Sequence, residues 1–155
     1  MNLIKLEGDN LIFAISKRDR RLLLDAFKLY PLIPVSHLKL TKSGAEAQMK
    51  ANQRLLEEAL AEQRAENKKQ VEALLNEEGR FKPAKTGFHL ALNQYQAEWL
   101  LQVLNDVRVG CWLILGEPDE KRGEEVNLTT ENAHHLFIME TCGYFQAILL
   151  GAIDR

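Results

Sequence analysis

YQAEWLLQVLNDVRVGCWLIL, residues 95–115, is the stretch of sequence that decides the fold. Its apolar side chains recur every three or four residues, the period of an α-helix, and further apolar side chains fill the remaining faces. A helix that is apolar on all sides is either the central helix of a soluble domain or a membrane span. Because Asn105, Asp106 and Arg108 lie in its middle, where a bilayer would make them costly, the pattern predicts a central core helix.

The composition is that of a globular protein. The chain has 155 residues, of which 46% are hydrophobic, and this predicts a single domain over residues 1–155 with its own core. A net charge of −2 provides no basic excess to hold phosphate backbones, so a nucleic-acid partner is not expected. The first residues, MNLIKLEGDN, lack the basic start and apolar run of a signal peptide. We therefore expect a cytoplasmic protein with no membrane association.

A small antiparallel β-sheet is predicted near the N-terminus. Two apolar runs, residues 3–6 and 11–15, flank residues 7–10, whose Gly, Asp and Asn tolerate positive φ angles and predict a hairpin turn. A hairpin is marginal alone, and residues 88–92, which include alternating Phe and Leu, are the predicted third strand. Residues 80–87, with one proline and one glycine, are predicted to be a linker.

Three further helices are predicted around the central one. The first is capped by Ser16 and stops before Pro31, because a helix interior excludes proline. The longest runs from a capping box at Ser43 to residue 78, and its polar middle predicts either a solvated bridge or a break. The last covers residues 131–153. Together these elements predict a mostly α (α+β) fold, a helical bundle around the central apolar helix with a small antiparallel sheet.

The polar side chains of the central helix are the candidate binding cluster. An unpaired buried charge costs several kcal/mol, so we expect Asp106 and Arg108 to be buried and bonded across to the last helix. Glu140 and Gln146 of the last helix are the obvious partners. With the neighbouring asparagine, the candidate binding cluster is Asn105, Asp106, Arg108, Glu140 and Gln146. A satisfied polar network between two core helices is the first interpretation, and a ligand site facing a cleft is the alternative.

Two glycines interrupt predicted helices. Glycine in a helix interior costs about 1 kcal/mol relative to alanine, and a packing requirement is the usual reason for it. We therefore expect Gly110 or Gly143 to mark a close crossing of two helices.

Motifs that would indicate catalysis or a metal site are missing from the sequence. There is no Gly-x-Ser-x-Gly, no phosphate-binding glycine-rich loop and no Cys-x-x-Cys, so an enzyme is not favoured. His134 and His135 are adjacent and point to different helix faces, so no metal or cofactor is expected. Cys111 and Cys142 lie in apolar helical patterns and are predicted to be buried thiols, with a disulfide or a metal pair as the alternative.

The central helix resembles the signature of a bacterial family, typical of actinobacteria, called domain of unknown function 2017. The matching residues are Trp99-Leu100, Leu104-Asn105-Asp106-x-Arg108, Gly110, Leu115-Gly116 and, in the last helix, Tyr144-Phe145-Gln146-x-x-Leu149-Leu150. The order of hairpin, leucine-rich helix and Lys/Glu-rich helix is similar too, whereas Gly110-Cys111-Trp112 and the longer charged helix depart from the family. Members are often encoded beside the ClpS protease adaptor, so the resemblance implies a role near protein turnover.

The sequence thus favours a cytosolic interaction or regulatory module. The long helix carries apolar patches at both ends of its polar middle, at residues 49–60 and 71–75, and a straight helix could not bury both in one small core. Self-association by two-fold symmetry is the commonest solution, so a homodimer is expected, with a further protein partner as an additional possibility. The alternative is a small-molecule-binding protein or enzyme whose site lies around Asp106 and Arg108.

Overall fold

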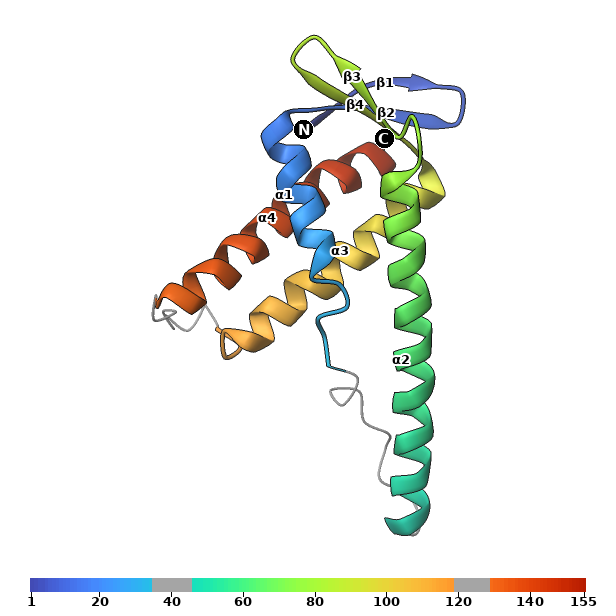
Figure 1. Ribbon diagram of the computed structural model, residues 1–155, viewed down its shortest axis with the longest axis vertical. Helices are drawn as coiled ribbons and strands as arrows, with labels where there is room; N and C mark the ends of the chain where they lie inside the picture. Colours follow the sequence, from blue (N-terminus) through green and yellow to red (C-terminus); the bar gives the residue numbers. More distant parts are fainter. Residues whose placement is uncertain (35–45, 119–128) are drawn as a thin grey trace.

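The computed structural model describes residues 1–34, 46–118 and 129–155. Within these residues the fold is mostly helical with one antiparallel sheet, which confirms the predicted α+β class (Figure 1). The elements follow in the order β1 (Asn2–Glu7), β2 (Asn10–Ile15), α1 (Lys17–Lys28), α2 (Glu46–Asn76), β3 (Phe81–Ala84), β4 (Gly87–Asn93), α3 (Gln94–Ile114) and α4 (Thr130–Ile153). The capping box predicted at Ser43 lies outside the described residues.

The sheet has the strand order β1-β2-β4-β3 and lies at one end of the molecule, above α1, α3 and α4 in Figure 1. The predicted hairpin and third strand are confirmed. In the β2–β4 pair Phe13 is opposite Leu90 and Leu11 is opposite Leu92, and all four side chains are buried. These cross-strand pairs cover the ends of the helices and hold the sheet to them.

The prediction that residues 80–87 form a linker is wrong, because they contain the edge strand β3. β3 pairs with β4 so that Pro83 lies opposite Phe88. Proline is tolerated in an edge strand, where its missing N–H faces away from the ladder. Gly87, at φ +150°, has to be glycine, since a Cβ there would lie 2.4 Å from the carbonyl oxygen of Ile15. At the turn between β3 and β4 the backbone of Gly87 therefore passes too close to the end of β2 for any side chain to fit.

Local capping fixes where the helices begin. The Ser16 hydroxyl accepts a hydrogen bond from the Asp19 N–H at 3.0 Å, as the sequence predicts. α3 begins with a reciprocal capping box in which Asn93 accepts from the Gln96 N–H and Gln96 accepts from the Asn93 N–H. The Thr129 hydroxyl accepts from the Asn132 N–H at the start of α4. Each bond satisfies a backbone group that helix geometry would leave unpaired.

The core lies where α3 and α4 pack against each other, with α1 and the sheet closing it. α3 contributes Leu100, Leu104 and Val107, and α4 contributes Phe145 and Leu149, all at most 1% exposed. α4 is also long and apolar enough to cross a membrane, as judged by length and composition alone. About 33% of this apolar stretch is buried inside the fold, where its side chains pack in the core with those of α3.

α2 is one continuous helix of 31 residues, so the alternative that it breaks in its polar middle is wrong. Its C-terminal part is attached to the fold through Val71, Leu74 and Leu75, all buried in the core. The core therefore covers the apolar patch at residues 71–75, whereas Leu55 of the patch at residues 49–60 stays 64% exposed. Figure 1 shows the N-terminal half of α2 extending well beyond the ends of α1, α3 and α4.

Candidate functional site

Asp106 holds the chain that follows α1 against α3. Its Oδ1 accepts hydrogen bonds from the backbone N–H of Leu32 at 2.7 Å and of Ile33 at 3.3 Å. Its Oδ2 lies 3.6 Å from a guanidinium nitrogen of Arg64 in α2, and these two side chains are only 12% and 14% exposed. Arg64 also donates to the Ile33 carbonyl oxygen. One carboxylate thus joins three separate parts of the chain, and this set is called the Asp106 clamp below.

The predicted cluster of five polar residues is not a single site. Arg108 does reach α4, donating to Gln146 at 3.3 Å, but it is exposed rather than buried. Asn105 and Glu140 are also exposed. The prediction that Asp106 bonds to the last helix is wrong, because its partners among the described residues belong to the chain after α1 and to α2. Asp106 and Arg108 are two residues apart on a helix and therefore face different neighbours.

The residues that sequence reasoning missed are the partners of Asp106. Arg64 is far from it in the chain and looks like one of many charged residues in a solvated helix. The other partners are the backbone N–H groups of Leu32 and Ile33, which have no side-chain signature at all. The one sequence signal is Pro31, which ends the first helix. The backbone N–H groups of Leu32 and Ile33 after it have no helical acceptor, and this could have suggested that a carboxylate accepts their hydrogen bonds.

Gly110 does mark a close approach, but the neighbour is not another helix. A Cβ on Gly110 would lie 2.6 Å from Cγ and 2.7 Å from Cβ of Leu32, so Leu32 packs directly on the α3 backbone. Gly143 is different: the nearest atom to a Cβ there would be Cζ of Arg108 at 3.7 Å, an ordinary contact. The expected close crossing at Gly143 is therefore not found, and the Gly110 contact belongs beside the Asp106 clamp.

A second polar cluster joins β1, α1 and α4. The amino group of Met1 lies 2.7 Å from Asp19 Oδ2 and donates to the Tyr144 hydroxyl at 2.7 Å, and this hydroxyl donates to the same carboxylate at 3.1 Å. Burial acts to raise the pKa of Asp19, but the hydrogen bond and positive charge of the amino group, together with Tyr144 and Arg18, lower the pKa below its usual value. The cluster is consistent with a structural tie between the sheet and the helices.

Both cysteines are buried free thiols, as predicted. Burial raises the pKa of Cys111 to about 11, and burial together with the proximity of Cys111 raises the pKa of Cys142 to about 12. Within the described part of the chain no three His, Cys, Asp or Glu side chains are grouped closely enough to hold a metal ion. A thiol held protonated in an apolar core is a poor nucleophile, so neither cysteine is suited to catalysis.

We expect native Cys111 and Cys142 to resist alkylation by iodoacetamide at pH 8 and to react only after unfolding. Their raised pKa values leave very little thiolate at that pH, and the core excludes the reagent. Mass spectrometry of protein labelled with and without urea measures this. A Lys69→Cys variant, at an exposed position on α2, is the control and should label rapidly. Rapid labelling of either natural cysteine in folded protein would contradict the burial.

Comparison with known proteins adds no relative. No family model, no curated protein and no solved structure matches the chain. The similarity to domain of unknown function 2017 therefore stays a prediction. What the molecule does is inferred from the surfaces that the fold presents.

Proposed function

We propose that the chain is an interaction module that self-associates through the projecting N-terminal half of α2. The observation that supports this is the helix itself, which continues for several turns beyond the body of the fold (Figure 1). Helix propensity alone contributes little stability, and most helices in proteins are stabilised by packing one face against another element. A helix that extends away from its own core therefore has a surface to offer to another chain.

The face of the projecting half that suits a second helix is formed by Ala51, Leu55 and Ala59. These residues are spaced four apart, share one side of the helix, and are all exposed, with Leu55 at 64%. When two copies run antiparallel and cross at Leu55, Ala51 of one lies opposite Ala59 of the other. A leucine flanked by alanines on both sides allows the two backbones to approach closely, with each leucine seated between small residues.

The charges beside this face are complementary under the same two-fold pairing. Arg54 and Glu58 are exposed and lie on the same edge of the face, on either side of Leu55 along the helix. An antiparallel partner places its Glu58 within reach of Arg54, and symmetry repeats the pair. Exposed ion pairs contribute little each, but they fix the orientation of the two helices and disfavour the parallel arrangement.

We expect reversible dimerisation with a Kd on the order of 10–100 μM, because the face is small and mobile side chains must be ordered on binding. Sedimentation velocity over a concentration series that spans this range measures it. Leu55→Glu should leave a folded monomer, since the side chain is exposed in the single chain. Leu150→Glu, the same change at a half-exposed leucine of α4, is the matched control and should dimerise normally.

A charge swap tests the orientation of the two helices. Arg54→Glu should weaken the dimer about tenfold by placing like charges opposite each other, and adding Glu58→Arg should restore it. Protein that stays monomeric at several times the upper end of the expected Kd, or dimers that Leu55→Glu leaves intact, would contradict the proposal. A double variant that fails to recover would exclude the antiparallel arrangement.

Three further predictions from the sequence belong to this proposal. A bundle organised around α3, a cytoplasmic location and a role near protein turnover are compatible with an interaction module, and the last is supported only by the resemblance described above. A small-molecule site around Asp106 and Arg108 is less well supported, because both oxygens of Asp106 are engaged by the chain itself.

A further inference from the structure

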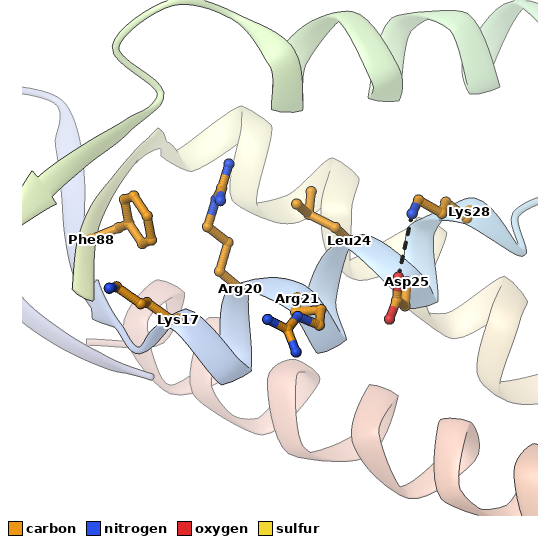
Figure 2. Close-up of a pocket in the computed structure, with 7 residues that line it drawn as sticks. All are labelled: Lys17, Arg20, Arg21, Leu24, Asp25, Lys28 and Phe88. Carbon is orange, nitrogen blue, oxygen red and sulfur yellow. Dashed lines mark hydrogen bonds and ion pairs between the residues drawn. The ribbon is translucent and has the colours of Figure 1, made fainter. Parts of the chain in front are cut away.

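An open cleft runs along α1 on the side that faces Phe88 of β4. Its volume is about 270 Å³, and Figure 2 shows Phe88 at one end, Lys28 at the other, and Arg20 and Leu24 between them. α1 has 12 residues, Lys17–Lys28, which corresponds to about 18 Å at 1.5 Å per residue. The cleft is an open groove lined by five charged side chains and two apolar ones, Leu24 and Phe88.

Arg20 is positioned on the floor of this cleft by aromatic rings. Its guanidinium carbon lies 4.6 Å from the ring centre of Phe88 and 5.0 Å from that of Phe81. Its Nε is buried and has no hydrogen-bond partner. No ion pair or hydrogen bond to its side chain is found among the described residues. The rings thus hold a guanidinium in a fixed orientation while leaving its hydrogen-bonding capacity unused by the fold.

The cleft is strongly positive in a chain that is negative overall. Four of its lining residues are cationic and one is acidic, so its formal charge is 4 − 1 = +3, against −2 for the whole chain. The one acidic group, Asp25, lies 3.4 Å from Lys28 Nζ, so this end is already neutralised. The unbalanced charge belongs to Lys17, Arg20 and Arg21, and of these Arg20 lies against Phe88.

We propose that this cleft binds an acidic segment of a partner protein, with carboxylates at Lys17, Arg20 and Arg21 and an apolar side chain on Leu24 and Phe88. Arginine binds carboxylates through paired N–H groups, and a fixed guanidinium loses little freedom on binding. The length of the cleft matches about five residues of extended chain at roughly 3.3 Å each. Small molecules prefer more enclosed pockets, and an extended nucleic acid would need a larger basic surface.

This binding surface is separate from the self-association face on α2, so the two proposals can fail independently. The probe is a fluorescein-labelled peptide of about ten residues, long enough to overlap the cleft, in which Asp and Glu surround one Leu and one Phe. Fluorescence anisotropy is measured on the full chain and on the Leu55→Glu variant. Binding is expected to both, to weaken as salt is added, and to be lost for a peptide with Asn and Gln in place of Asp and Glu.

Two exposed positions and a neighbouring control locate the site. Lys17→Glu combined with Arg21→Glu should weaken peptide binding about tenfold or more without unfolding, because both side chains are exposed. Arg18→Glu, the same change on the same helix outside the cleft, should have an effect of about twofold or less. Arg20→Gln, with its fold checked by circular dichroism, should also weaken binding.

Three results would overturn the proposal. The first is no anisotropy change with the acidic peptide at about 1 mM protein, the weakest affinity of interest. The second is equal weakening by Arg18→Glu and by the cleft variants, which would indicate only a diffuse charge effect. The third is binding of inorganic phosphate, single-stranded RNA or anionic lipid vesicles that the cleft variants abolish while the peptide does not bind. That outcome would assign the cleft to a phosphate-bearing ligand.

Discussion

Replacing Asp106 with alanine is expected to lower the free energy of unfolding by about 3 kcal/mol. The change removes the acceptor for two backbone N–H groups, at Leu32 and Ile33, and leaves the largely buried side chain of Arg64 without its carboxylate. Urea denaturation followed by circular dichroism measures the loss. The stability of Asp106→Asn should lie between those of the parent and Asp106→Ala, since the amide oxygen can still accept from the Leu32 N–H but carries no charge to pair with Arg64.

Arg108 provides the matched control for this prediction. It lies two residues from Asp106 on the same helix, is exposed, and donates one hydrogen bond to Gln146. Arg108→Met should therefore change stability by at most about 0.5 kcal/mol, as surface changes usually do. Equal destabilisation by Asp106→Ala and Arg108→Met would mean that the Asp106 clamp does not hold the chain after α1.

Gly110→Ala is expected to destabilise the fold by about 1–2 kcal/mol, even though alanine is the better helix former. The added methyl group would lie within 2.9 Å of three carbon atoms of Leu32, one of them the Cβ. Leu32 cannot simply withdraw, because its N–H is bound to Asp106. Relief of the overlap therefore requires either a shift of α3 or the loss of that hydrogen bond. Thermal unfolding monitored by circular dichroism compares the variant with the parent.

Two further variants separate overlap from a general effect of the substitution. Gly143→Ala should be neutral or stabilise by up to about 1 kcal/mol, because the nearest atoms to its added methyl group belong to the flexible end of Arg108, at 3.7 Å or more. Adding Leu32→Gly to Gly110→Ala should give a total loss smaller than the sum of the single losses, since glycine at position 32 lacks all three carbon atoms that the methyl group would overlap. A Gly110→Ala protein that melts at or above the parent temperature would refute the close contact.

The parts of the fold that the sequence predicts correctly are those with local signals. The hairpin turn at residues 8–9, the Ser16 cap of α1 and the Asn93 capping box of α3 each depend on residues within a few positions of one another. The apolar periodicity likewise identifies α3, α4 and the buried side of β4. Such features are determined by backbone conformation and side-chain spacing, so they can be recognised without knowledge of the rest of the chain.

Tertiary structure alone decides what depends on distant parts of the chain. β3 is a strand because β4 offers it an edge, not because residues 81–84 favour one strongly. Asp106 was recognised as a residue in need of a partner, but the partners are two backbone amides and Arg64, brought close only by folding. The basic cleft arises in the same way, since Phe81 of β3 and Phe88 of β4 orient Arg20 of α1. A sequence shows that a buried charge must be satisfied, whereas the identity of the group that satisfies it depends on the packing of all the elements.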